Sequence, residues 1–336
     1  MNTAVNTEAV FSGDVLKVDA ARVVEQITTT IRDVVLKRLR RKGAVVGLSG
    51  GIDSSVVAAL SVRALGREKV LALLMPERES SEDSLTLGGL VAHHLGINTL
   101  VEDITPSLEA VGAYRRRDDM IHTVIAEYGP GYKSKIVLPD LLDQKYRIFS
   151  VVVRSPEGRE IRARLTPEAY HGVVAATNFK QRIRKMLEYY HADRLQYAVL
   201  GTPNRLEYDQ GFFVKNGDGA ADLKPIAHLY KTQVYQLAEY LEIPDEIRRR
   251  PPTTDTYSLS QSQEEFYFSL PYDKMDLCLY GKNHGVSAQD VAGAVGLTPE
   301  QVEHVYSDIS AKRQATRYQH LRPLLVECIA EIAAEQ

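Results

Sequence analysis

The spacing of apolar residues predicts alternating helices and strands in the first third of the chain. Apolar side chains recur every three or four residues from Val23 to Val35, as on one face of a helix, and Asp19 is placed to cap its first turn. Continuous apolar runs at 44–48 and 70–75 indicate buried strands, with another strand expected near 99–103. Helices at 54–65 and up to about residue 95 separate them. This order predicts an α/β fold with an open, mostly parallel sheet and helices on both faces.

The pattern changes after Pro106, and residues 113–175 are expected to form an insertion. Residues 146–165 alternate between polar and apolar, and the turn-forming segment Ser155–Gly158 lies between the two halves, which predicts a β-hairpin. The arginine run at 115–117 is expected on a solvated face, and contact with phosphate groups is the alternative. A helix begins at Thr166, a strand follows at 197–201 and a helix at 229–241, and the C-terminal third is mostly helical. We therefore expect a loose arm over 1–18 and a single domain over 19–336.

Composition excludes several classes of protein. The chain has 336 residues, of which 44% are hydrophobic and 25% charged, and its formal net charge is −3. Bulk charge therefore gives no reason to expect binding to nucleic acid or to a membrane surface. The two cysteines cannot form a disulfide framework, and no apolar run approaches the roughly 20 residues needed to cross a bilayer. A cytoplasmic location is the expectation.

A glycine-rich turn lies between the first strand and the following helix. It reads Ser49-Gly50-Gly51-Ile52-Asp53-Ser54-Ser55. Backbone amides at a helix N-terminus bind anions, and the two glycines let the backbone come close to a phosphate. Asp53 would repel bare phosphate but suits Mg²⁺ held between the two. The turn is not a Walker A loop, since no Gly-Lys-Ser/Thr ends it.

A second polar, glycine-rich stretch at 201–233 follows another strand, at the edge where open α/β sheets bind ligands. It contains carboxylates suited to a metal and lysines suited to anionic ligands, among them Glu207, Asp222, Lys215 and Lys231. A solvated surface loop is the alternative reading of this stretch.

Taken together, the two stretches resemble the ATP pyrophosphatases of the NAD synthetase family. The first resembles the pyrophosphate-binding loop of that superfamily. The second resembles the family's Gly-Thr-x-Asn-x-x-Glu and Gly-Asp-Gly-x-x-Asp elements. Residues 178–184, 252–255 and 312–313 match its Asn-x-x-x-Arg-x-Arg, Pro-Thr-x-Asp and Lys-Arg elements. The resemblance implies a Rossmann-like ATP pyrophosphatase fold. It also implies amidation of nicotinate adenine dinucleotide with ammonia, through an adenylylated intermediate that releases AMP and pyrophosphate.

The resemblance also implies roles for individual residues. Asp53 and Lys231 would be catalytic, and Asp53 and Glu207 would hold Mg²⁺. ATP would be bound by Gly47, Leu48, Ser49, Gly50, Gly51, Ile52, Asp53, Ser54, Arg78, Thr202, Lys231 and Thr253. The dinucleotide would be bound by Arg182, Lys215, Asp222 and Lys312. A homodimer is implied as well.

Three features depart from the family or limit the resemblance. Ala311 stands where the family often has histidine, and the 113–175 insertion has no counterpart. Only 48 residues precede Ser49, fewer than a fused glutaminase needs, so we expect free ammonia or a separate ammonia-supplying glutaminase. The same chemistry on another carboxylate, such as nicotinate mononucleotide, stays open.

DNA binding is the more distant alternative, because residues 289–302 are similar to a helix-turn-helix. The second of these helices would carry Glu300, Glu303 and Asp308, which oppose phosphate.

Overall fold

The computed structural model describes residues 11–138, 149–253 and 256–329. Its central sheet has four parallel strands in the order β3-β2-β1-β7. These strands are β1 (Ala44–Gly47), β2 (Val70–Leu74), β3 (Asn98–Val101) and β7 (Ala198–Leu200). The predicted α/β class and each of the predicted strands of this sheet are confirmed.

Alternation along the strands divides the core between the two faces of the sheet. Val46 and Ala72 pack on the face covered by α1 (Ala20–Arg32), α2 (Ile52–Leu65), α3 (Glu82–Leu95) and α8 (Lys231–Tyr240). Val45 and Leu73 pack on the other face, against α4 (Thr105–Ala110), α5 (Ala113–His122) and the 29-residue α6 (Pro167–Leu195). Strands buried on both faces read as continuous apolar runs, which is why they were visible in the sequence.

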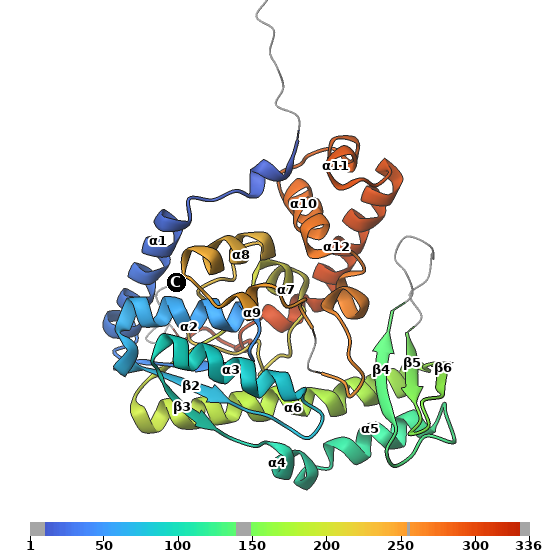
Figure 1. Ribbon diagram of the computed structural model, residues 1–336. Coiled ribbons are helices and arrows are strands. Elements are labelled where there is room, and N and C mark those ends of the chain that lie inside the picture. The colour runs from blue at the N-terminus through green and yellow to red at the C-terminus, as the bar shows by residue number, and fades with distance from the viewer. Residues whose placement is uncertain (1–10, 139–148, 254–255, 330–336) are drawn as a thin grey trace, which may run out of the picture.

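The segment predicted to be an insertion contains a separate antiparallel sheet of three strands with the order β4-β5-β6 (Figure 1). These are β4 (Lys133–Val137), β5 (Ser150–Arg154) and β6 (Glu160–Arg164). The β5–β6 hairpin was predicted, although residues 146–148 of the predicted segment lie outside the described residues. Strand β4 was not predicted. Its buried Ile136 shares a small core with Val151 and Val153 and with residues of α5 and α6.

The C-terminal part is helical, as expected. It contains α10 (Tyr272–Asn283), α11 (Ala288–Val295) and α12 (Pro299–His320), while α7 (Arg205–Gln210) and α9 (Asp245–Arg248) connect it to the sheet. Short π-helical turns end at Arg38 and Phe268, and a 3₁₀ turn covers Arg67–Lys69.

The prediction of a loose arm over 1–18 is wrong for residues 11–18. A 3₁₀ turn at Gly13–Leu16 places Leu16, which is 4% exposed, in the core of the C-terminal helices. The side-chain amide of Gln236 on α8 fixes this segment, because it accepts from Val18 N and donates to Leu16 O, both at 3.0 Å. Residues 1–10 lie outside the described residues.

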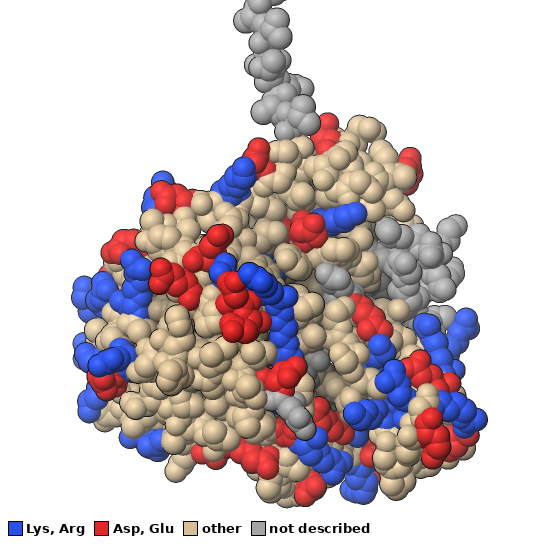
Figure 2. All heavy atoms as spheres, viewed as in Figure 1, with Lys and Arg blue, Asp and Glu red and all other residues tan. Residues whose placement is uncertain are grey.

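Positive and negative side chains are interspersed over the visible face of the molecule (Figure 2). Among the described residues, no helix combines the length and the apolar character that membrane crossing requires.

Two glycines that end helices with similar backbone angles provide a test of the packing of α12. Gly211 (φ +73°) ends α7, and a Cβ there would lie 2.2 Å from Thr316 Cβ; Gly296 (φ +64°) ends α11 and faces open space. Gly296→Ala should lose about 1–2 kcal/mol from its left-handed backbone alone. Gly211→Ala should lose more, because buried Thr316 must also move. Urea unfolding measures both losses; equal losses would contradict the close packing.

Candidate active site

A cavity of about 770 Å³ opens at the carboxyl edge of the parallel strands. The whole predicted phosphate loop, residues 47–54, lines it. Thr202, Glu207, Lys231, Thr253 and Lys312 line it as well. The structure therefore brings most of the predicted nucleotide-binding residues to one cavity, although they come from distant parts of the sequence.

The glycine-rich loop is held open toward the cavity by its own hydrogen bonds. Gly50 has φ +75°, and a Cβ there would meet Leu87 Cβ at 2.9 Å and two backbone atoms of α3 at 3.0 Å. Ser54 Oγ donates to Gly51 O at 3.0 Å and accepts from Ser49 N at 3.3 Å. Gly51 caps α2 without a side-chain hydrogen bond. The N-terminus of α2 thus directs backbone donors and the positive end of its dipole at the cavity, an arrangement that binds anions.

A charged centre adjoins the loop. Lys231, 2% exposed at the first turn of α8, forms a short ion pair with Asp53 at the first turn of α2. Asn204 Nδ2 donates to Asp53 Oδ1 at 3.1 Å, and the same residue forms a reciprocal capping box with Glu207 on α7. Gln263 Nε2 donates to Glu207 Oε1 at 3.0 Å.

The electrostatics of this centre favour an added cation. Desolvation and the nearby charge of Asp53 raise the pKa of Glu207 to about 8. Burial disfavours the Lys231 ammonium, yet the charges of Asp53 and Glu207 keep its pKa above the ordinary value. No group of three or more His, Cys, Asp or Glu in the described ranges could hold a metal by itself. A hard cation between Asp53 and Glu207 would therefore complete its coordination with phosphate oxygens and water, as Mg²⁺ commonly does.

Asp276 of α10 holds the helix that carries Lys231. Its side chain is fully buried and accepts from Lys231 N at 3.2 Å and from Thr232 N at 2.7 Å. Burial raises its pKa to about 7. Asp276 thus caps α8 from another element.

Four predicted ligand residues do not line the cavity. Arg182 Nε donates to Lys215 O at 3.3 Å, and Lys215 Nζ donates to Tyr318 O at 2.8 Å, which places both beside α12. Asp222 accepts from Val199 N at 2.8 Å. The Arg78 guanidinium lies 3.5 Å from the ring centroid of Tyr114 and bonds Glu109 Oε1 at 3.2 Å.

Lys312 does reach the cavity. Its Nζ donates to Tyr267 O at 2.7 Å, pairs with Asp308 Oδ2 at 3.0 Å and lies 4.4 Å from the ring centroid of Tyr267. Tyr267 and the neighbouring Phe266 also line the cavity.

One wall of the cavity is a face of α6 whose residues were not among the predicted ligands, although residues 178–184 were matched to a family element. Polar residues spaced three or four apart line it: Thr177, Asn178, Gln181, Arg184, Lys185 and Glu188. Lys185 Nζ and Glu188 Oε2 form a buried pair at 2.5 Å. The polar spacing of these residues can be seen in the sequence, but a polar stripe on a helix usually faces solvent, so the spacing favours an exposed face over a cavity wall.

The fold and site define a class of nucleotide-binding α/β proteins with a phosphate loop at the carboxyl edge of a parallel sheet. A family model described as NAD synthase matches residues 23–127 and 152–319, so that only residues 128–151 of the predicted insertion at 113–175 are unmatched. The chain belongs to the NAD synthase family.

Relatives and a solved structure agree with this assignment. The chain is 60% identical to an NH(3)-dependent NAD(+) synthetase from Rhizobium meliloti (strain 1021), over 96% of this chain and 97% of that protein. It is 62% identical to one from Mesorhizobium japonicum (strain LMG 29417 / CECT 9101 / MAFF 303099), over 94% and 99% of the two chains. The structure of an NMN synthetase from Francisella tularensis has the same fold, with a TM-score of 0.63 and 21% identity over 92% of this chain and 99% of that one.

Gly50→Ala tests whether the loop needs a left-handed, side-chain-free position. The Cβ would force the loop away from α3, so we expect ATP binding to weaken at least about tenfold, by calorimetry with a non-hydrolysable analogue. Gly89→Ala, in α3 with open space around its Cβ, is the matched control and should bind normally. Normal affinity in Gly50→Ala would refute the role of this loop.

The buried carboxyl of Asp276 predicts a pH dependence of stability. Its pKa is raised from 3.8 to about 7, so the folded state binds the proton more tightly than the unfolded state does. The stabilisation from this group is complete below about pH 4 and is lost as pH rises toward 7, by up to about 1.4 kcal/mol per pH unit. Relative to Asp276→Asn, the wild type should thus lose stability between pH 5 and pH 8 in urea unfolding. The exposed Asp273→Asn should keep the wild-type slope; an equal slope in Asp276→Asn would refute the assignment.

Proposed function

We propose that this protein forms NAD from nicotinate adenine dinucleotide and ammonia, with cleavage of ATP to AMP and pyrophosphate. The observation that carries the proposal is the Asp53–Lys231 pair beside the amide-lined loop and Glu207, within one cavity. The names of the 57–62% identical relatives support the same activity.

The chemistry follows from the weakness of a carboxylate as an electrophile. Its negative charge repels nucleophiles, and oxide is a poor leaving group. Attack of the nicotinate oxygen on the α-phosphorus of ATP releases pyrophosphate and forms a mixed anhydride. Ammonia then adds to the acyl carbon and AMP leaves. Negative charge develops on phosphate oxygens in the first step, where the amides of residues 47–54 and Lys231 stabilise it.

Asp53 and Glu207 are the residues that would hold Mg²⁺. Their oxygens are hard ligands, and the raised pKa of Glu207 marks a place where an added positive charge is favourable. When bound, the ion would neutralise charge on the phosphates. Thr202, Thr253 and Arg78 are assigned to ATP in the same proposal.

Arg182, Lys215, Asp222 and Lys312 are assigned to the dinucleotide, and a second copy of the chain completes that site. Arg182, Met186 and Tyr190 form one stripe of α6, and Met186 and Tyr190 are each 60% exposed. An exposed apolar stripe beside proposed ligand residues supports a homodimer. A monomer by sedimentation at assay concentration would contradict it.

Ammonia reaches the cavity free or from a separate glutaminase. Cys278 is fully buried, and burial raises the pKa of its thiol to about 12, so it is not a glutaminase nucleophile. A cytoplasmic location is proposed on the basis of the two free cysteines.

The decisive experiment is an amidation assay with ATP and the acid dinucleotide. Ammonium should support turnover, glutamine alone should not, and AMP should form in equal amount to NAD. Lys231→Met should lower kcat at least about 100-fold, because developing phosphate charge loses its partner.

Nicotinate mononucleotide is the competing substrate, and turnover of the dinucleotide at no more than one-tenth of its rate would overturn the assignment. Glutamate release matching NAD formation would overturn the proposed ammonia dependence.

A further inference from the structure

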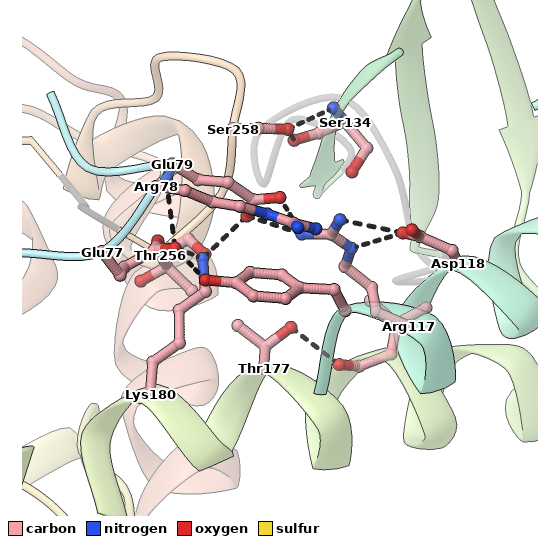
Figure 3. Close-up of polar contacts among 12 residues, drawn as sticks. Glu77, Arg78, Glu79, Arg117, Asp118, Ser134, Thr177, Lys180, Thr256 and Ser258 are labelled. Atoms are coloured by element: carbon pink, nitrogen blue, oxygen red, sulfur yellow. Dashed lines mark hydrogen bonds and ion pairs between the residues drawn. The ribbon is translucent and has the colours of Figure 1, made fainter. Parts of the chain in front are cut away.

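A buried ion network lies beside the cavity and joins α5, α6 and the β2–α3 connection (Figure 3). Lys180 Nζ on α6 lies 2.6 Å from Glu77 Oε1 and 2.9 Å from Glu79 Oε2, and donates to Thr256 O at 3.1 Å. Arg117 on α5 donates to both oxygens of Glu79, at 2.8 and 2.6 Å. The side chains of Lys180, Glu77 and Arg117 are at most 5% exposed, which corrects the expected solvated face for Arg117.

The network connects two walls of the cavity. Its two glutamates lie between Pro76 and Ser80, and both of these residues line the cavity. Thr256 and Lys180 line the cavity as well, so the bond from Lys180 Nζ to Thr256 O joins a second part of the cavity lining to the first. The Lys180 ammonium is therefore the group through which the β2–α3 connection is bonded to Thr256.

Charge balance fixes the geometry of the network. The carboxylates of Glu77 and Glu79 face the cations of Lys180 and Arg117, and Arg117 also pairs with the more exposed Asp118 at 2.8 Å. Tyr114 OH donates to the second oxygen of Glu77 at 2.6 Å. Burial opposes ionisation of Glu79, but hydrogen bonds and charges from Arg117 and Lys180 lower its pKa to about 2. Both oxygens of Glu77 and both oxygens of Glu79 have a donor, so neither glutamate can turn away without leaving a buried charge unpaired.

We propose that Lys180 is a positioning residue for nucleotide binding, which sets the separation of the two cavity walls before ATP arrives. The proposal rests on the placement of ATP in this cavity given above. Lys180 acts by holding the two cavity walls in place. Without it, the walls must become ordered when ATP binds, and this loss of entropy weakens the binding of ATP. The expected effect is a raised KM for ATP with kcat nearly unchanged.

The test uses Glu77→Gln/Lys180→Met, which removes one positive and one negative charge together. The Glu79–Arg117 pair remains, and the glutamine still accepts from Tyr114, so the variant keeps a balanced interior while losing the bond to Thr256 O. We expect the KM for ATP to rise about tenfold, kcat to stay within threefold, and the KM for the dinucleotide to stay within twofold. Hydrogen exchange without nucleotide should be faster at 77–80 and 256–258.

Two controls separate positioning from general stability. Glu77→Gln alone leaves Lys180 between Glu79 and Thr256 and should keep the wild-type KM for ATP. Val151→Ala removes buried volume in the insertion core, which should lower stability without changing that KM.

The outcomes are distinct. A wild-type KM for ATP in the double variant would overturn the proposal, and so would equal changes in both KM values with unchanged hydrogen exchange. If ATP does not bind at the glycine-rich loop, Gly50→Ala will keep the wild-type KM for ATP, whatever the result for the double variant.

Discussion

The ion pair between Lys231 and Asp53 is the interaction on which the site depends. Each partner stands in the first turn of its helix, α8 or α2, so the pair fixes the ends of two helices that pack on the same face of the sheet. With Lys231 only 2% exposed, neither charge could be left without the other, since breaking such a pair is costly. Asp53 lies near the end of the phosphate loop, so its pairing with Lys231 anchors this end of the loop.

The C-terminal helices contribute to the site by supporting that pair from behind. Asp276 on α10 receives the first amides of α8, and the core of α10, α11 and α12 buries the helix that presents it. Gln236, one helical turn beyond Thr232, bonds the segment at 16–18. The helical C-terminal part therefore stabilises the position of Lys231. Its helix α12 also places Lys312 in the cavity.

The parts predicted from sequence are those whose cause is local. Buried strands are continuous apolar runs, Thr166 caps the helix that follows it, and the glycine-rich turn carries its own geometry. The missed parts depend on distant partners. Arg117 is buried only because Glu79 meets it from 38 residues away, and β4 is a strand because β5 pairs with it. Leu16 is ordered by Gln236, a contact that no local pattern could indicate.

The same distinction explains why the proposed ATP residues other than Arg78 converge on the cavity, whereas of the proposed dinucleotide residues Lys312 alone reaches it. The loop, Thr202, Glu207 and Lys231 follow strands or begin helices at one sheet edge, so the topology of a single chain brings them together. Arg182 and Lys215 instead lie beside the exposed face of α6, next to Met186 and Tyr190. A long dinucleotide bound there would need a second surface to enclose it, and burying this apolar stripe would supply the free energy for one. The exposed face of α6 that carries Met186 and Tyr190 is therefore where binding of the dinucleotide and dimerisation of the chain would be coupled.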